Sequence, residues 1–241
     1  MSGGIFPVTR PSAISDLLSG DPGRQERSLA VLAEVYWRPL YKYVRLRWGK
    51  SGEDAEDLTQ GFFAGALGRE VLSQFDPARA RFRTFLRRCV DRFVIDDHRR
   101  TTAQRRGGKD RLTVDFAAAE REVAGAAPST DPEAAFEAEW LSHLVAVATA
   151  RLLETLARKG KPHHAELFRR FHLGGDPPAY ADVAAELGIT VTDVTNWLSY
   201  ARREFRRTAL ELLREVTVSE DEFAEEARAA FGLDVRAGTP G

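Results

Sequence analysis

The residues best suited to chemistry in this sequence are basic side chains set among aromatic ones between Phe75 and Arg100. From Arg79 to Arg111 the chain carries twelve Lys or Arg residues and four Asp residues, a local balance of +8, although the net charge of the whole chain is −1. Arginines beside aromatic rings suit a surface that binds phosphates and stacks bases. This segment therefore predicts a nucleic-acid interface.

A helix over residues 82–100 would position these side chains. Its apolar stripe is expected to face a core, and the stripe consists of Phe82, Phe85, Leu86, Cys89 and Phe93. The arginines beside the stripe or just before the helix are predicted to contact DNA; they are Arg79, Arg81, Arg83, Arg87, Arg88, Arg92, Arg99 and Arg100. A solvated charged face is the alternative interpretation. The surplus of one sign favours an anionic partner, because the charges repel one another without it.

Residues 180–205 have the pattern of a helix-turn-helix. The small Ala184 lets two helices approach closely, and Gly188 permits a left-handed turn. Thr190 and Asp193 can cap the second helix. Its polar face is predicted to read a major groove, and it consists of Thr192, Thr195, Asn196, Ser199, Arg202, Arg203 and Arg206. A helical hairpin with a solvated polar face is the alternative.

Residues 53–60 are acidic, in contrast to the arginine-rich segment, and their acidic and polar side chains share one face of a predicted helix. Ser51 and Asp54 form a variant of the capping box at its start. Phe63 lies off the apolar stripe of this helix and is expected to be exposed. An acidic face beside an arginine-rich helix suits a protein partner, and an ordinary solvated face is the alternative.

The periodicity predicts an all-α protein: two small helical domains joined by a flexible linker, the second containing the helix-turn-helix. Gly107-Gly108 and the stretch that ends at Pro132 indicate the linker. Pro39 is expected to kink or divide the first long helix. The expected parts are an N-terminal extension at 1–25, a helical domain at 26–105, a linker at 106–132, a helix-turn-helix domain at 133–216 and an acidic tail at 217–241. The tail could cover a basic surface.

Composition argues against several classes of protein. The single cysteine, Cys89, excludes an intramolecular disulfide and fits a reducing compartment. No apolar stretch approaches the roughly 20 residues that span a bilayer, and the N-terminus lacks a signal-peptide pattern. We therefore expect a soluble, cytoplasmic protein.

Catalytic and metal-binding patterns are weak. The clusters that resemble metal ligands are Asp96-Asp97-His98 and His163-His164. Adjacent residues on a helix point about 100° apart, so neither cluster is preorganised for a metal. We expect no metal, no cofactor and no catalytic residue, and a metal-dependent nuclease at Asp96, Asp97 and His98 is the enzymatic alternative.

Together these motifs resemble bacterial sigma factors of the extracytoplasmic-function type. The strings that carry the resemblance are YWRPLYKYVRLRWG, EDAEDLTQGFF, FDPARARFRTFLRRCVDRFVIDDHRR and YADVAAELGITVTDVTNWLSYARREFRR. Their order and separation are similar to that family from about Arg10 to Val216. The TRPSAI-like start and the DLTQGFF string are similar to its long-tailed members in planctomycetes and related bacteria.

The resemblance implies a non-enzymatic promoter-specificity subunit of RNA polymerase. Its first domain would dock on the clamp helices of the largest polymerase subunit, and the residues that match the docking helix are Asp54, Asp57, Leu58, Gln60 and Phe63. The helix at 82–100 would engage and help to open the proximal promoter element. The second domain would read the distal element and contact the polymerase flap.

Two departures leave the promoter sequence open. Family members commonly carry Arg-Asn where this chain has Asp91-Arg92, and many have a more basic recognition helix around Trp197, which we expect to be a core residue. The resemblance also leaves open an anti-sigma factor as a partner. A stand-alone helix-turn-helix regulator, which binds duplex DNA without polymerase, is the alternative function.

Overall fold

The regular secondary structure is helical throughout the residues that the computed structural model describes, which are 12–18, 21–66, 69–76, 78–101, 112–125 and 131–235. This confirms the all-α prediction. The chain divides into two compact units. Unit 1 holds the described residues up to His143 and from Leu213 onward, and unit 2 holds Leu144–Leu212.

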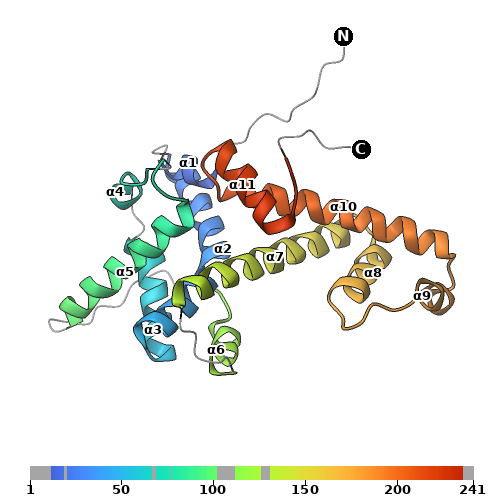
Figure 1. Cartoon of the computed structure of the whole chain (residues 1–241), viewed down its shortest axis with the longest axis horizontal. Coiled ribbons are helices and arrows are strands. Elements are labelled where there is room, and N and C mark those ends of the chain that lie inside the picture. The colour runs from blue at the N-terminus through green and yellow to red at the C-terminus, as the bar shows by residue number, and fades with distance from the viewer. Residues whose placement is uncertain are drawn as a thin grey trace, which may run out of the picture. The chain divides into compact units, whose positions relative to one another are not determined.

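Figure 1 labels the helices in chain order. Unit 1 contains α1 (Ala13–Leu18), α2 (Pro22–Trp48), α3 (Gly52–Gly61), the π-helix η1 (Phe62–Ala66), α4 (Arg69–Leu72), α5 (Phe82–Thr101), α6 (Phe116–Gly125) and α11 (Glu220–Phe231). Unit 2 contains α8 (Pro162–His172) and α9 (Tyr180–Leu187). Both unit boundaries fall inside helices, which are α7 (Pro132–Arg158) and α10 (Val191–Glu215). The units differ from the predicted domains, because the beginning of α7 and the acidic helix α11 belong to unit 1.

Helix α2 begins and ends at residues that favour helix termini. The side chain of Asp21 accepts hydrogen bonds from two backbone N–H groups of the first turn, at 2.9 and 3.2 Å, and Gly49 ends the helix with a φ of 58°. The helix is not divided at Pro39, although a proline in a helix interior costs about 3 kcal/mol. Burial of Tyr36 and Leu40, which are 1% and 0% exposed, offsets that cost.

The apolar stripe of α5 packs into the core of unit 1, as predicted. Phe82 and Leu86 are fully buried, Cys89 is also buried, and Phe85 and Phe93 are half-buried. The ring of Phe82 meets an aromatic ring of α2 edge-on, with 6.0 Å between centroids. Burial raises the pKa of Cys89 to about 11, so its thiol stays protonated at neutral pH.

Helix α3 passes directly into the π-helical turn η1, and this turn changes which side chains face the core. Phe62 and Phe63 are both buried, and their ring centroids lie 5.5 Å apart. The prediction that Phe63 is exposed is therefore wrong. That prediction assumed an α-helical spacing of about 100° per residue, whereas the i→i+5 hydrogen bonding of a π-turn alters the register.

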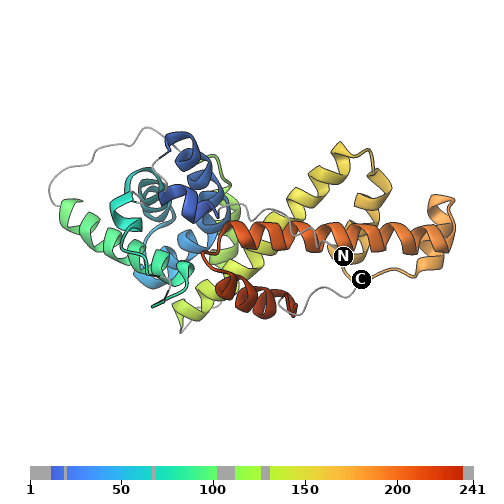
Figure 2. The same ribbon diagram turned by 90° about the horizontal axis from the view of Figure 1, so that it is seen from above.

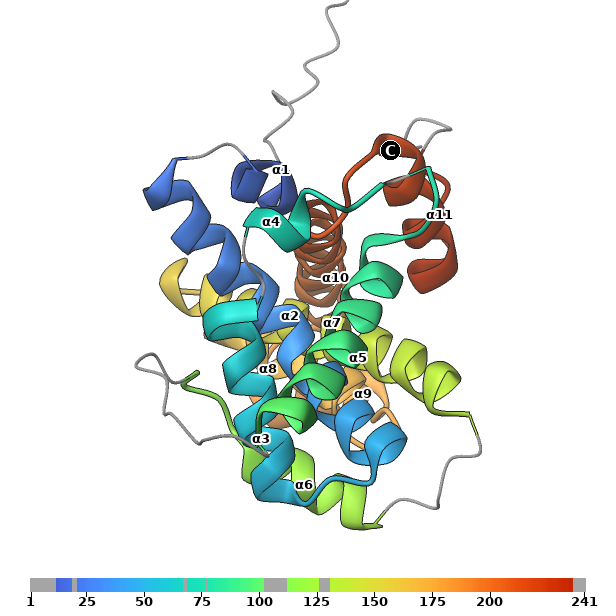
Figure 3. The ribbon, with the colours of Figure 1, turned by 90° about the vertical axis from the view of Figure 1, so that its left-hand side faces the viewer.

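Residues 116–125 form α6, although the sequence assigned them to a flexible linker. Arg45 of α2 holds α6 through two contacts with the carboxylate of Glu120, at 2.8 and 2.6 Å. Phe116 is buried, with its ring 5.1 Å from that of Trp37. Figure 3 shows α6 beside α2. Contacts between distant parts of the chain therefore stabilise a helix with no clear periodicity of its own.

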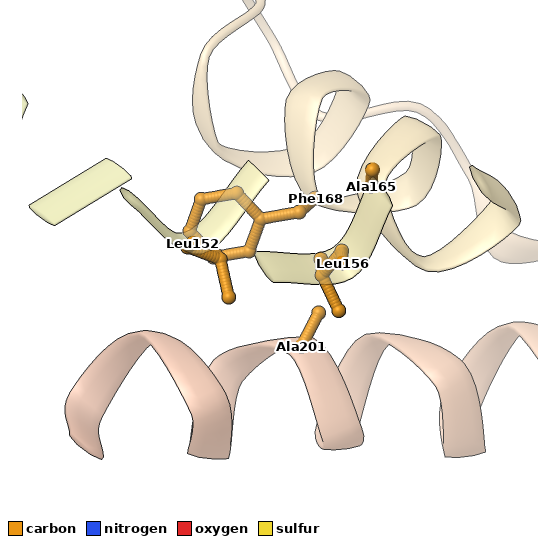
Figure 4. Packing of buried hydrophobic residues seen from close by; sticks show 5 residues of the cluster. All are labelled: Leu152, Leu156, Ala165, Phe168 and Ala201. Atoms are coloured by element: carbon orange, nitrogen blue, oxygen red, sulfur yellow. The ribbon is translucent and has the colours of Figure 1, made fainter. Parts of the chain in front are cut away.

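Two apolar clusters hold unit 2 together. One cluster joins α7, α8 and α10 and is shown in Figure 4; it consists of Leu152, Leu156, Ala165, Phe168 and Ala201. The other joins α8, α9 and α10 and consists of Leu167, Val183, Ala184, Val194 and Leu198. Every member is at most 5% exposed, so these clusters fix α9 and the first half of α10 against α8.

The connection between α9 and α10 has the local geometry that the sequence predicts. Gly188 adopts a left-handed conformation with a φ of 64°. The hydroxyl of Thr190 accepts a hydrogen bond from the backbone N–H of Asp193 at 3.1 Å, and the Asp193 carboxylate accepts one from the backbone N–H of Thr190 at 3.1 Å. Helix α10 then continues without a break to Glu215 (Figure 2).

Candidate nucleic-acid and protein interfaces

The arginines predicted to bind the proximal promoter element lie in different environments. Four are exposed, namely Arg79, Arg81, Arg88 and Arg92. The side chain of Arg79 is 84% exposed and pairs with Asp76 at 3.1 Å, a contact that solvent screens. The side chains of Arg99 and Arg100 lie outside the part of the chain that the structure describes. The exposed arginines are able to reach phosphate groups.

Arg83 and Arg87 lie in the interior of unit 1, where the sequence analysis expected a surface. They are 8% and 7% exposed. Arg83 pairs with Glu137, and Arg87 pairs with Glu133 at 2.5 Å. The guanidinium of Arg83 also lies 4.5 Å from the ring centroid of Trp140. The two arginines are four residues apart on α5 and the two glutamates are four residues apart on α7, so one face of α5 meets a matching face of α7. This shared spacing is the signal in the sequence that could have predicted the contact.

The beginning of α5 lies beside α11 (Figure 3), and acidic side chains of α11 contact it. Glu226 is 2% exposed, and its carboxylate pairs with Arg83 and, at 3.2 Å, with Arg81. Glu222 accepts a hydrogen bond from the backbone N–H of Phe82, the first residue of α5, at 3.0 Å. A carboxylate from the C-terminal part of the chain thus satisfies a donor at the positive end of α5.

Asp91, one of the departures from the sigma-factor pattern, connects α5 to the end of α2. Its carboxylate accepts hydrogen bonds from the hydroxyl of Tyr43 at 3.1 Å and from the indole N–H of Trp48 at 3.0 Å. Burial and the Asp91 charge raise the pKa of Tyr43 to about 12, so the phenol keeps the proton that it donates. Asp91 therefore has a structural role in this chain.

Replacing Asp91 by alanine is expected to lower the free energy of unfolding by about 1–2 kcal/mol, because two partly buried donors lose their acceptor. Urea unfolding measures this change. Asp57→Ala is the control, because Asp57 is exposed on α3 and its substitution is expected to change stability by less than about 0.5 kcal/mol. Equal unfolding midpoints for the two variants would contradict the structural role.

The residues predicted to bind polymerase lie on α3 and η1 and divide by exposure. Asp54 and Asp57 are exposed. Asp54 also takes part in the predicted cap, since its carboxylate accepts a hydrogen bond from the hydroxyl of Ser51 at 2.8 Å. The other three are at most 9% exposed, and they are Leu58, Gln60 and Phe63. The two acidic side chains are thus available to a partner, while the three buried side chains anchor α3 and η1 in unit 1.

The predicted distal-element residues share one side of α10. Six of them are exposed, namely Thr192, Thr195, Asn196, Arg202, Arg203 and Arg206, and Ser199 is half-buried. The Nε of Arg202 donates to Nε2 of His172 at 3.0 Å. Burial and the charge of Arg202 lower the pKa of His172, which favours the neutral, accepting ring. The face offers short polar side chains near the start of α10 and arginines further along.

Trp197 is partly buried on the other side of α10, in agreement with its expected place in the core. The rings of His163 and His164 stack on it, each with 5.4 Å between centroids. These histidines resembled metal ligands in the sequence, but here they serve as packing surfaces. No group of three or more His, Cys, Asp or Glu residues in the described ranges is arranged to hold a metal ion.

One comparison with known protein families finds a match within unit 1. Residues 32–104 match the family model of sigma-70 region 2. The match covers α2 from Leu32 onward, α3, η1, α4 and α5. It supports a factor of the sigma-70 family and indicates a role in RNA polymerase binding and promoter melting. No curated protein and no solved structure matches the chain significantly. Among the described residues, no helix has the length and apolar character required to cross a membrane.

Proposed function

We propose that this protein is a sigma factor of the extracytoplasmic-function type, which binds core RNA polymerase and directs promoter recognition, promoter opening and transcription initiation. The match of residues 32–104 to sigma-70 region 2 carries this proposal. The exposed carboxylates of α3 and the exposed arginines around α5 support it, because polymerase and DNA require surfaces of opposite charge. The TRPSAI-like start and the DLTQGFF string favour the long-tailed planctomycete-like group.

The acidic side of α3 is the proposed docking surface for the clamp helices of polymerase. Asp54 and Asp57 would make the polar contacts. Gln60 is nearly buried, and its amide donates to Glu56 at 2.8 Å. Leu58 and Phe63 act indirectly in this proposal, because their burial fixes the direction of the helix.

Asp57→Lys is expected to weaken binding to bacterial core RNA polymerase about tenfold, a loss of about 1.4 kcal/mol, because a charge at the docking surface is reversed. Titration of a labelled chain with purified core polymerase measures the affinity. Glu26→Lys on α2 is the matched control, since it makes the same charge change at an exposed site of unit 1. A wild-type chain that does not bind core, or equal binding by wild type and Asp57→Lys, would contradict the proposal.

The second proposed surface is the start of α5 with the segment before it. Arg79, Arg81, Arg88 and Arg92 are exposed there and would contact the phosphates of the proximal promoter element. Arg83 and Arg87 are held in ion pairs, so we assign them a DNA contact only after their pairs have opened.

The third proposed surface is a helix-turn-helix in unit 2 that reads the distal promoter element. The left-handed Gly188, the reciprocal cap of Thr190 and Asp193, and the buried cluster around Ala184 support this proposal. The exposed polar side chains at the start of α10 suit base edges, and the arginines further along suit phosphates.

Arg203→Ala and Arg206→Ala are each expected to weaken DNA binding and to reduce the slope of log K against log salt by about 0.9, since each removes one phosphate contact. Fluorescence anisotropy with duplex DNA over a salt series measures both quantities. Arg207→Ala is the control, because Arg207 pairs with Glu204 and Glu211 in the same helix. If the two variants and the control have the same salt slope as the wild type, DNA does not bind this face.

A further inference from the structure

Helix α11 supplies three carboxylates to the cationic beginning of α5. Glu222 accepts the backbone N–H of Phe82 at 3.0 Å, and its second oxygen accepts the backbone N–H of Val218 at 2.8 Å. Glu225 lies 3.4 Å from Arg81. Glu226 pairs with Arg81 and Arg83. Each of these glutamates thus engages a group of α5 or of the residue just before it.

The groups that α11 occupies are those that a nucleic-acid phosphate uses. Phosphates bind guanidinium groups and the backbone N–H groups at helix N-termini. Arg83 is only 8% exposed, and the buried carboxylate of Glu226 contacts its guanidinium. A phosphate therefore cannot reach Arg83 or the first N–H of α5 while α11 remains in place, and the two ligands exclude each other.

The contacts of α11 suit a segment that can be displaced. The helix has 12 residues, and isolated helices of this length are marginal in water, so α11 depends on its docking. Its buried apolar side chains are small apart from Phe223, and they include Ala224 and Ala227. Burial raises the pKa of Glu226 against the opposing effect of Arg83, which shows that desolvation counteracts the ion pair.

We propose that α11 is an intramolecular competitor of DNA, in which Glu222, Glu225 and Glu226 take the places of DNA phosphates until promoter DNA displaces the helix. The consequence is autoinhibition: the free chain has a weakened affinity for DNA, and the beginning of α5 becomes available only when α11 leaves. This inference rests on the proposed function in one respect, since it takes the beginning of α5 as a DNA-binding surface.

The test is the affinity of the full chain for a 20-nucleotide single-stranded DNA of mixed sequence, measured by anisotropy between about 50 and 200 mM NaCl. Glu226→Gln is expected to bind about tenfold more tightly than the wild type at the lower salt concentration, with a steeper salt slope, because a cationic site is released. Glu220→Gln is the matched control: it removes the same charge from the same helix, but Glu220 pairs with Arg214, outside α5. It is expected to leave the affinity within about twofold of the wild type.

A reversal variant separates competition from simple unfolding. Arg81→Gln is expected to abolish most of the gain in the Glu226→Gln background, because Arg81 is one of the cations that the loss of the Glu226 charge releases. A gain that persists without Arg81, or a Glu226→Gln affinity equal to that of Glu220→Gln, would overturn the proposal.

Amide hydrogen exchange on the wild-type chain provides a test without substitutions. Saturating DNA is expected to reduce the protection of amides in α11, because the displaced helix unfolds. Unchanged protection in α11 at saturating DNA would refute competition. None of these measurements contains polymerase, so a failure of competition and a failure of the sigma-factor proposal give different results: the first leaves core binding intact, and the second does not.

Discussion

Arg83→Met is expected to lower the free energy of unfolding of unit 1 by about 3 kcal/mol. The methionine leaves the carboxylate of Glu226 in a site that is 2% exposed and removes its closest cation. It also removes the cation that lies over the ring of Trp140. Urea unfolding followed by tryptophan fluorescence measures the change, since Trp37, Trp48 and Trp140 belong to unit 1.

Two variants accompany this measurement. Arg79→Met changes an arginine that is 84% exposed and is expected to alter stability by less than about 0.5 kcal/mol. Adding Glu226→Leu to Arg83→Met is expected to recover most of the lost stability, because a buried ion pair replaced by apolar side chains is often neutral. If Arg83→Met and Arg79→Met have the same urea unfolding midpoint, the buried ion pair does not stabilise unit 1.

Leu198→Ala is expected to destabilise unit 2 by about 3 kcal/mol and to abolish its DNA binding at temperatures where the variant unfolds. Leu198 is 0% exposed and belongs to the cluster that fixes α9 against α10. The loss of three side-chain carbons leaves a cavity between α8, α9 and α10. Thermal unfolding and amide hydrogen exchange in α9 measure the effect.

Leu173→Ala is the matched control for this substitution, because the same side chain is removed where it is 52% exposed. Its effect is expected to stay below about 0.5 kcal/mol. If Leu198→Ala and Leu173→Ala unfold at the same temperature, the cluster does not determine the position of α9. The same conclusion follows if the amides of α9 exchange as slowly in Leu198→Ala as in the wild type.

The features that the sequence predicted correctly depend on residues close together in the chain. The caps at Ser51 and at Thr190 involve partners three positions away, and the left-handed conformation of Gly188 follows from the absence of a side chain. The buried stripe of α5 is also local, because helical spacing alone places Phe82, Leu86 and Cys89 on one face.

The features that the sequence did not predict depend on distant partners. Glu222 and Phe82 are 140 positions apart, and Glu226 and Arg83 are 143 positions apart. Periodicity describes only the face of one helix and does not identify what covers it. The same pattern of arginines is therefore compatible with a face that binds DNA and with a face that packs on acidic helices of the same chain. Arg83 packs on acidic helices, because it is buried and pairs with Glu226.

Two further differences have causes that residue types do not reveal. Phe63 is buried because α3 continues as a π-turn, and no residue in DLTQGFF specifies that turn on its own. Helix α6 lies in an alanine-rich stretch that resembled a linker, and its stability depends on ion pairs such as Arg45–Glu120, whose partners are 75 positions apart.

Run-off transcription tests the central claim most directly. Bacterial core RNA polymerase is incubated with a library of genomic DNA fragments, with or without the chain, and the 5′ ends of the transcripts are mapped. A sigma factor is predicted to produce transcripts with discrete start sites that share upstream elements, and Asp57→Lys is predicted to produce fewer of them at equal protein concentration. The contradicting result is a set of start sites that is the same with and without the chain, while the chain alone binds duplex DNA, since that outcome identifies a regulator that acts without polymerase.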